Sequence, residues 1–132
     1  MRTASFSTAR GPGRIQISRG APRRHPAGYR QARLLAPGPW FGSVAADEYV
    51  RRYRDILDGL DPQVTWDLLH RLAGQDVEPV LLCFERAPFS STNWCHRRIV
   101  AEWFERTLGH DVPEDEGDSR PMSEILGFDI WR

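Results

Sequence analysis

The 132 residues suit one domain of ordinary size, and a hydrophobic content of 40% is enough for one core. No run approaches the roughly 20 apolar residues of a membrane helix, and the first residues lack the apolar core of a signal peptide, so we expect a cytoplasmic protein. The net charge of zero hides an asymmetry: residues 1–46 hold eight arginines and no carboxylate (+8), whereas residues 47–132 hold ten arginines and eighteen carboxylates (−8). The basic third could attract a phosphate, a nucleotide or a nucleic acid, or it could fold against the acidic remainder.

The basic third predicts two strands and a long loop. A short strand is expected within residues 1–8, and the glycines and proline of residues 11–13 indicate a turn. In residues 14–18 two isoleucines alternate with polar residues, which is typical of a half-buried strand. Four prolines exclude regular helix from most of residues 21–42, a long loop rich in proline, glycine and arginine whose large apolar side chains argue against disorder. His25 in this loop is expected to be a surface or packing residue.

Two helices are expected in the next thirty residues. Ser43 is the expected N-cap of the first, whose apolar residues recur at helical spacing over residues 49–60. Asp61 is the expected cap of the second, Pro62 its first residue and Gly74 its end. The apolar stripe of the second helix is expected to be Val64, Leu68, Leu69 and Leu72.

The second half of the chain predicts one buried strand and one further helix. Residues 79–84 form an apolar run between two carboxylates, as expected for a central strand buried on both faces. A helix is expected from about Trp94 to Leu108, with Thr92 or Asn93 as its cap and Gly109 as its end.

The last residues predict an acidic linker and an apolar tail, together spanning residues 114–132. Carboxylates dominate residues 114–120, which are expected to be exposed, and Val112 just before them is compatible with one more short strand. The apolar side chains of residues 125–131 must dock on some surface.

Strands alternating with helices predict an α/β fold over residues 1–132. We expect a small single domain whose parallel or mixed sheet is flanked by helices, in a Rossmann-like, three-layer arrangement. Ligands of such folds bind beyond the carboxyl ends of the strands. That edge is expected to hold Ser18 and Arg19 after the early strand and residues 83–85 after the central strand, with the helix start at Cys95 beside them.

Cys95 lies where the last long helix is expected to begin. The partial positive charge of a helix N-terminus favours the thiolate form, and Arg97 and a protonated His96 would strengthen the effect. An anion would bind there for the same reasons, and Glu85 could act as an acid or base. Cys95 could equally belong to the core, because apolar helix residues follow it four and eight positions later. The residues leave both alternatives open.

The two cysteines, Cys83 and Cys95, are interpreted first as reduced thiols and second as a disulfide, because no secretion signal precedes them. Cys83, Cys95 and His96 are all residue types that bind metal ions, and Glu85 or His110 could supply a fourth ligand. Their spacing argues against it: the thiols are twelve residues apart without a CxxC pair, and adjacent helix residues point about 100° apart. We therefore predict no metal site, and the sequence indicates no particular cofactor.

Several segments of the chain resemble the motifs of a known bacterial family. Residues 81–86 form an apolar strand that ends in a Cys-aromatic-Glu step, and residues 95–103 begin with Cys-His-Arg. Together with residues 17–23 and 35–37 they resemble the bacterial family known as domain of unknown function 488, over about residues 14–114. The resemblance implies a compact α/β fold and a bacterial cytoplasmic setting, but no activity. It also implies one cluster that holds Ser18, Arg19, Cys83, Glu85, Cys95, His96 and Arg97.

Three functions are compatible with these observations. The leading hypothesis is an enzyme or enzyme-like domain that binds a small anionic ligand, of phosphate or nucleotide type, at the strand ends. Cys95 would be its nucleophile or redox thiol, and Glu85 with His96 would move protons. The residues that would hold the anion are Ser18, Arg19 and Arg97. The alternatives are a non-catalytic module that binds phosphate or nucleic acid, and an interaction protein that docks a partner through its apolar tail.

Overall fold

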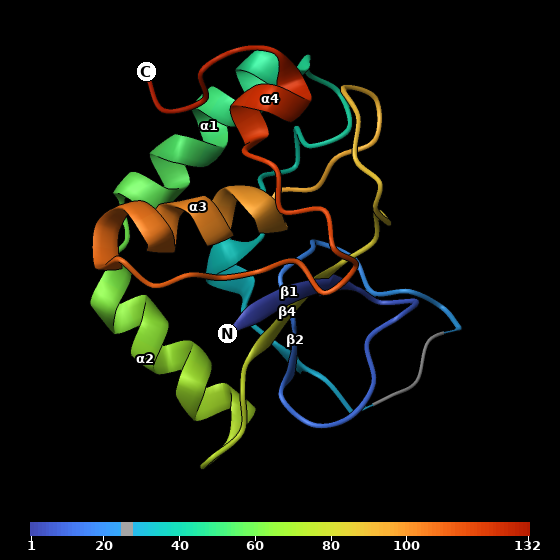
Figure 1. Cartoon of the computed structure of the whole chain (residues 1–132), viewed down its shortest axis with the longest axis vertical. Coiled ribbons are helices and arrows are strands. Elements are labelled where there is room, and N and C mark those ends of the chain that lie inside the picture. Colours follow the sequence, from blue (N-terminus) through green and yellow to red (C-terminus); the bar gives the residue numbers. More distant parts are fainter. Residues whose placement is uncertain (25–27) are drawn as a thin grey trace.

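The chain forms a small sheet covered by helices, and the computed structural model describes residues 1–24 and 28–132 (Figure 1). The predicted role of His25 therefore lies outside the described residues. The elements in chain order are β1 (Arg2–Ser5), β2 (Arg14–Gln16), β3 (Arg30–Gln31), the 3-10 helix η1 (Arg33–Leu35), α1 (Ala46–Asp58), α2 (Pro62–Ala73), β4 (Val80–Cys83), α3 (Arg97–Leu108) and α4 (Met122–Leu126). None of the helices in these ranges has the length and apolar character needed to cross a membrane.

The sheet is parallel throughout its described strands, in the order β1-β4-β2-β3. Leu81 of β4 is in register with Thr3 of β1 on one side and with Ile15 of β2 on the other. All four residues of β4 are buried, which confirms the central strand expected from its continuous apolar run. The predicted α/β class is confirmed, and of the two sheet types considered the parallel one is present.

The two faces of the sheet are covered differently. Leu81 and Ile15 belong to the main core, to which all four α-helices contribute, and Figure 1 shows these helices on one side of the sheet. The alternate residues Val80 and Leu82 point to a second, smaller core with Phe6. In the described part of the chain, that second face is covered by the segment after β1 and by Tyr29 rather than by helices.

Helix α2 begins as its sequence predicts. Asp61 is the N-cap, and its Oδ1 accepts a hydrogen bond of 2.9 Å from the backbone N–H of Val64. Gly74 ends the helix with a positive φ of 106°. The predicted stripe is partly wrong, because Val64 is 63% exposed, whereas Thr65 and Leu69 are buried.

Two predicted helix starts are wrong. Helix α1 begins at Ala46 rather than directly after Ser43, whose hydroxyl donates to the carbonyl oxygen of Trp40 at 3.1 Å. Helix α3 begins at Arg97, because residues 90–93 form a turn closed by backbone hydrogen bonds in both directions between its first and last residue. The two residues before Arg97 therefore precede the regular helix, which changes how their side chains can converge.

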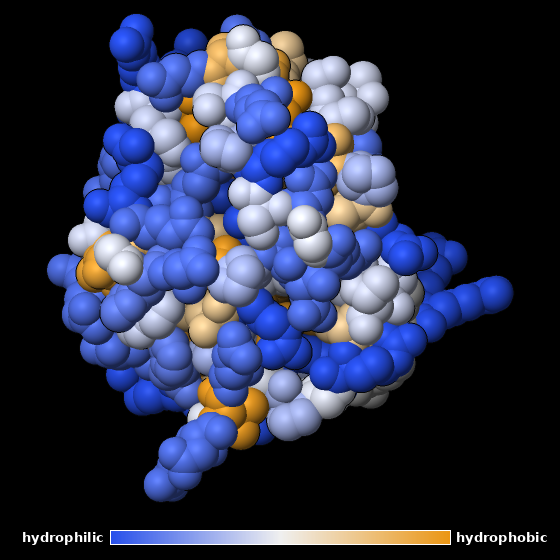
Figure 2. All heavy atoms as spheres, in the orientation of Figure 1, coloured by the Kyte–Doolittle hydropathy of each residue, from blue (hydrophilic) through white to orange (hydrophobic). Residues whose placement is uncertain are grey.

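The segments predicted as loop and tail are more ordered than expected. The described part of residues 21–42 contains β3 and η1, and Leu35 is fully buried. Residues 114–132 contain α4, and Ile130 near their end is buried in the main core. The apolar tail packs on its own domain, whereas its proposed role in binding a partner stays a prediction. The face in Figure 2 accordingly carries mostly hydrophilic side chains, with apolar ones in small patches.

Candidate functional site

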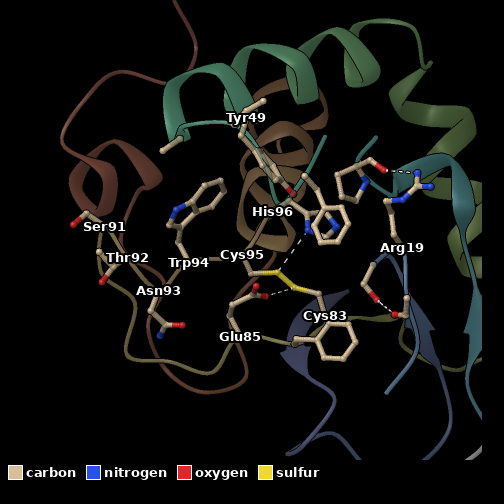
Figure 3. Close-up of a pocket in the computed structure, with 17 residues that line it drawn as sticks. Arg19, Tyr49, Cys83, Glu85, Ser91, Thr92, Asn93, Trp94, Cys95 and His96 are labelled. Carbon is tan, nitrogen blue, oxygen red and sulfur yellow. Dashed lines mark hydrogen bonds between the residues drawn. A yellow bond between two sulfur atoms is a disulfide. The ribbon is translucent and has the colours of Figure 1, made fainter. Parts of the chain in front are cut away.

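A cavity of about 590 Å³ lies at the carboxyl edge of the sheet (Figure 3). Five of the six site residues predicted from the sequence line it, from three separate segments, and Arg97 is the exception. Those five are Ser18, Arg19, Glu85, Cys95 and His96. The other lining residues are Gly20, Pro37, Phe41, Val44, Ala46, Tyr49, Cys83, Phe84, Ser91, Thr92, Asn93 and Trp94.

Backbone hydrogen bonds bring these segments together. Strands β2 and β4 are parallel neighbours, and the N–H of Ile17 donates to the carbonyl oxygen of Leu82 at 3.0 Å. The residues that follow the two strands therefore leave the sheet side by side. The carbonyl oxygen of Ile17 also accepts a hydrogen bond of 2.8 Å from Nε2 of His96, which fastens the segment before α3 to the same edge.

A tight turn places Arg19 at one rim of the cavity. The side-chain amide of Gln16 donates to the carbonyl oxygens of Ser18 and Gly20 at 3.1 and 3.0 Å, and the Ser18 hydroxyl also donates to Gly20, at 2.7 Å. Arg19 is exposed, and its Nη1 donates to the carbonyl oxygen of Pro37 at 3.2 Å. The position of Arg19 follows from the strand end, whereas its ligand-binding role stays a prediction.

Cys83 and Cys95 form a disulfide in the wall of the cavity (Figure 3). Both side chains are buried, and twelve residues separate them. The expectation of two reduced thiols is wrong for this structure. The pairing follows from the chain path, because Cys83 ends β4 and the turn before α3 returns Cys95 to that strand end.

Arg97 is directed away from the cavity, and its side chain is fully buried. Its Nε and Nη2 donate to the two carboxylate oxygens of Glu114 at 2.8 and 3.1 Å, and its Nη1 donates to the carbonyl oxygen of Glu85 at 2.6 Å. Its Nη1 lies 3.4 Å from Sγ of Cys83, and its backbone nitrogen lies 3.5 Å from Sγ of Cys95. The predicted anion-holding role of Arg97 is therefore wrong, because protein groups already bind its guanidinium.

The environment of Glu114 differs from the sequence prediction. It was expected to belong to an exposed acidic linker, but its side chain is completely buried against Arg97. A buried guanidinium needs a carboxylate at this place, because an unpaired charge in the interior is very costly. The sequence held no periodic signal for this pair, since the two residues lie seventeen positions apart and in different segments.

His96 is held neutral in the cavity wall. Burial lowers its pKa to about 4, and the nearby charge of Arg97 acts in the same direction, whereas the hydrogen bond to Ile17 opposes the shift. A carbonyl oxygen only accepts, so Nε2 carries the proton and Nδ1 is left with its lone pair. Nδ1 lies 3.7 Å from Sγ of Cys95. The protonated His96 considered from the sequence is therefore not the form expected near neutral pH.

Glu85 supplies the carboxylate of the cavity. Its side chain is half-buried, and Oε2 lies 3.7 Å from Sγ of Cys83 (Figure 3). Burial, followed by the charge of Glu85, raises the pKa of Tyr49, so that phenol keeps its proton. The arrangement places a proton acceptor, a phenol and an imidazole on one cavity, which is a set suited to acid–base chemistry.

The outer wall of the cavity is formed by residues that the sequence did not single out. The rings of Trp94 and Tyr49 meet edge to face with centroids 4.9 Å apart. The loop that carries Trp94 is fastened at Phe89, whose N–H donates to Oδ2 of Asp118 at 2.7 Å. The aromatic residues of this loop were the sequence feature that could have indicated the outer wall. The orientation of their side chains, however, depends on the contact with the distant carboxylate of Asp118.

Three residues of the cavity wall have ligand atoms suited to a metal ion. Those of Cys83, Cys95 and His96 lie within 4.8 Å of one another. The sequence argument against a shared ion assumed that the last two lie in a helix, but both precede regular α3. Of the two further ligands considered, Glu85 lines the same cavity, whereas His110 does not.

Comparison with known proteins identifies one family. The family model described as "Domain of unknown function DUF488" matches residues 16–104, which is 89 of the 132 residues. The matched region contains α1, α2, β4, most of α3 and every site residue predicted from the sequence. No curated protein and no solved structure gives a significant match.

Proposed function

We propose, starting from the fact that this chain belongs to the DUF488 family, that the domain is an enzyme-like protein whose cavity binds a small anionic ligand of the phosphate or nucleotide class. The observation that supports this most directly is the convergence of polar residues from three distant segments on one cavity at the carboxyl edge of a parallel sheet. This edge is where ligands of open α/β sheets bind.

Charge within the cavity gives the ligand an orientation. Arg19 is an exposed cation at one rim, and the N-terminus of α3, with its partial positive charge, follows directly from lining residues. Glu85 is an anion, and Figure 3 shows it away from Arg19, with the two sulfur atoms between them. We expect the anionic group of the ligand beside Arg19 and a hydroxyl or amine beside Glu85.

Aromatic side chains favour a nucleotide over a bare phosphate. Phe41 and Phe84 line the cavity and are 53% and 47% exposed, which is unusual for such large apolar residues. An exposed aromatic ring offers a stacking surface for a nucleobase, and every base has a face that can use it. Trp94 and Tyr49 line the same cavity, although their rings already contact each other.

The acid–base part of the proposal rests on Glu85. Its carboxylate is the ionisable group at the end of the cavity opposite Arg19, and it can accept a proton from a ligand hydroxyl or amine. Cys95 can take part in this chemistry as a thiol only in the reduced protein, because its sulfur is bonded to Cys83 in the structure. The neutral His96 then offers the lone pair of Nδ1 to that thiol at 3.7 Å.

Titration of nucleotides and inorganic phosphate against the protein tests the proposal. Binding is followed by calorimetry and by tryptophan fluorescence, since Trp94 lines the cavity. Arg19→Ala should weaken binding about tenfold, the worth of one charge-assisted hydrogen bond. Arg23→Ala is the matched control, because Arg23 is an exposed arginine four residues away that does not line the cavity. Absence of saturable binding by any of these ligands, or equal effects of the two variants, contradicts the proposal.

A second candidate function is non-catalytic binding of nucleic acid, favoured by a separate observation. The segment that follows the cavity rim carries exposed arginines with no carboxylate between them. They are Arg19, Arg23, Arg24, Arg30 and Arg33. Phosphate contacts of this kind make affinity fall steeply with salt. Tight binding of a single-stranded oligonucleotide that weakens equally in Arg19→Ala and Arg23→Ala would favour this candidate over the nucleotide cavity.

A further inference from the structure

Cys83, Cys95 and His96 form a possible metal-ligand set in the cavity wall, a role separate from the acid–base role proposed for the last two. Ligand atoms of Cys83, Cys95 and His96 lie within 4.8 Å of one another, and Sγ of Cys95 is 3.7 Å from Nδ1 of His96. Around a tetrahedral zinc ion, with Zn–S of about 2.3 Å and Zn–N of about 2.0 Å, neighbouring ligand atoms are separated by roughly 3.5–3.8 Å. We infer that in the reduced protein these three residues bind one zinc-like divalent cation. This inference goes beyond the proposed function and does not depend on it.

The ring of His96 is oriented as a ligand would be. Its Nε2–H donates to the carbonyl oxygen of Ile17 at 2.8 Å, which leaves Nδ1 unprotonated and directed at Cys95. Metal-binding histidines almost always donate their other ring N–H to a carbonyl or carboxylate, because this fixes the tautomer and the ring orientation.

Both sulfur atoms have N–H groups beside them that would stabilise thiolates. The backbone nitrogen of Arg97 lies 3.5 Å from Sγ of Cys95, and its Nη1 lies 3.4 Å from Sγ of Cys83. The charge of the guanidinium is already balanced by Glu114. Two thiolates and one divalent cation therefore add no net charge to this buried place, which keeps the electrostatic cost of the site low.

A fourth coordination position faces the cavity. Oε2 of Glu85 lies 3.7 Å from Sγ of Cys83, which is again the separation of two ligands on one ion. Three protein ligands with an open or exchangeable fourth position are the pattern of catalytic zinc sites, whereas structural sites are closed by four. We assign the fourth position to Glu85 in the absence of ligand, so Glu85→Gln should weaken metal binding less than loss of a cysteine.

The metal site and the disulfide are alternative states of the same two sulfur atoms. Binding converts two thiols and one Zn²⁺ into a zinc dithiolate and releases two protons, whereas the disulfide offers no thiolate. The Cα atoms of Cys83 and Cys95 are 7.0 Å apart, slightly beyond the roughly 4.4–6.8 Å that disulfides usually span. The same backbone separation leaves room for an ion between the two side chains.

Metal loading of the untagged, full-length protein tests the inference. The protein is reduced with a phosphine under argon, loaded with Zn²⁺ or Co²⁺, and freed of excess metal on a chelating resin. We expect about one equivalent of metal per chain by elemental analysis, and a thiolate-to-cobalt charge-transfer band with tetrahedral visible bands for Co²⁺. The same protein oxidised to the disulfide should retain almost none. A folded, reduced protein that retains no metal, or a cobalt spectrum without the thiolate band, overturns the inference.

Variants locate the site. Cys83→Ser and Cys95→Ser should each reduce the charge-transfer band, and His96→Gln should weaken Co²⁺ binding at least about tenfold. His110→Gln is the matched control, since His110 is exposed and does not line the cavity. Equal affinities of His96→Gln and His110→Gln overturn the assignment. If the cysteine variants fail to fold, the comparison of reduced with oxidised wild-type protein decides. No nucleotide is present, so this test and that of the proposed function can fail separately.

Discussion

The carboxylate of Glu114 binds the guanidinium of Arg97 through two hydrogen bonds of 2.8 and 3.1 Å, and both side chains are completely shielded from solvent. The same carboxylate accepts a hydrogen bond of 2.8 Å from the hydroxyl of Thr3, and that hydroxyl accepts one of 2.9 Å from Nη1 of Arg98. The network therefore joins β1, the start of α3 and the segment after α3. Because Arg97 also contacts both sulfur atoms, the network fixes the wall of the cavity from outside it.

Loss of Glu114 should be strongly destabilising. Glu114→Ala leaves a buried guanidinium unpaired, and we expect the free energy of unfolding to fall by about 3–5 kcal/mol in urea titrations. Glu48→Ala, which removes an exposed partner of Arg52 on α1, should cost less than about 1 kcal/mol. The double variant Arg97→Met with Glu114→Leu should recover part of the loss, since both charges of the buried pair are removed together. Similar losses for Glu114→Ala and Glu48→Ala would contradict this account.

Reduction of the disulfide should lower stability by a predictable amount. Cross-linking Cys83 to Cys95 restricts the unfolded chain over a loop of twelve residues, which corresponds to about 3 kcal/mol in the loop-entropy model. Urea titrations with and without a phosphine, both in the presence of a chelator, measure the difference. The double variant Cys83→Ser with Cys95→Ser should not respond to the reductant. A wild-type difference below about 0.5 kcal/mol would show that the cross-link does not act through the unfolded state.

The sequence was sufficient to predict the carboxyl edge of the sheet, because that edge depends on local patterns. The apolar run of β4 and the alternation in residues 14–18 each identify a strand, and parallel strands end at the same edge. Hence Arg19 and Glu85 could be expected on one cavity. The class of the fold followed from the same alternation of strands and helices.

The contents of the site could not be predicted to the same extent, because they depend on contacts between distant segments. The direction of Arg97 is decided by Glu114, and no repeat connects the two positions. The convergence of Cys95 and His96 depends on where α3 begins, and a backbone turn in residues 90–93 shifts that start. The first residue of a helix is the least certain feature that a sequence pattern predicts. An error of three residues at the start of α3 was enough to hide that the side chains of Cys95 and His96 can approach each other.

Removal of Asp118 should loosen the outer wall of the cavity. Its carboxylate accepts the N–H of Phe89 at 2.7 Å, while Arg120 binds both the carboxylate and the carbonyl oxygen of Phe89. Asp118→Ala should accelerate amide exchange in residues 86–93 about tenfold, the equivalent of one lost hydrogen bond to a charged group. Hydrogen-exchange mass spectrometry measures this. Asp111→Ala, an exposed aspartate nearby in sequence, should leave the exchange unchanged.

The same contact has a defined pH dependence. The hydrogen bond from Arg120 is the main cause that lowers the pKa of Asp118, with the N–H of Phe89 acting in the same direction. A carboxyl whose pKa is lower in the folded state stabilises that state above its ordinary pKa of about 3.9, and the contribution is lost as the pH falls below it. After correction for intrinsic exchange rates, protection of residues 86–93 should be equal at pH 7 and pH 5. A marked loss of protection at pH 5 would contradict the assignment to Asp118.

Alanine substitutions at Gly13 and Gly11 distinguish the stability cost of a strained backbone conformation from that of a steric collision. Both have a positive φ, of 85° and 84°, but a Cβ on Gly13 would collide with the backbone carbonyl of Glu78, whereas one on Gly11 would meet nothing within 4 Å. Gly11→Ala should therefore cost only the strain of the left-handed conformation, about 1 kcal/mol, and Gly13→Ala should cost at least about 2 kcal/mol in urea titrations. Because the carbonyl oxygen of Gly13 accepts the N–H of Val80 at 2.8 Å, the larger loss would fall where β2 and β4 pair. Equal losses would mean that φ alone determines the cost and that the contact with Glu78 relaxes freely.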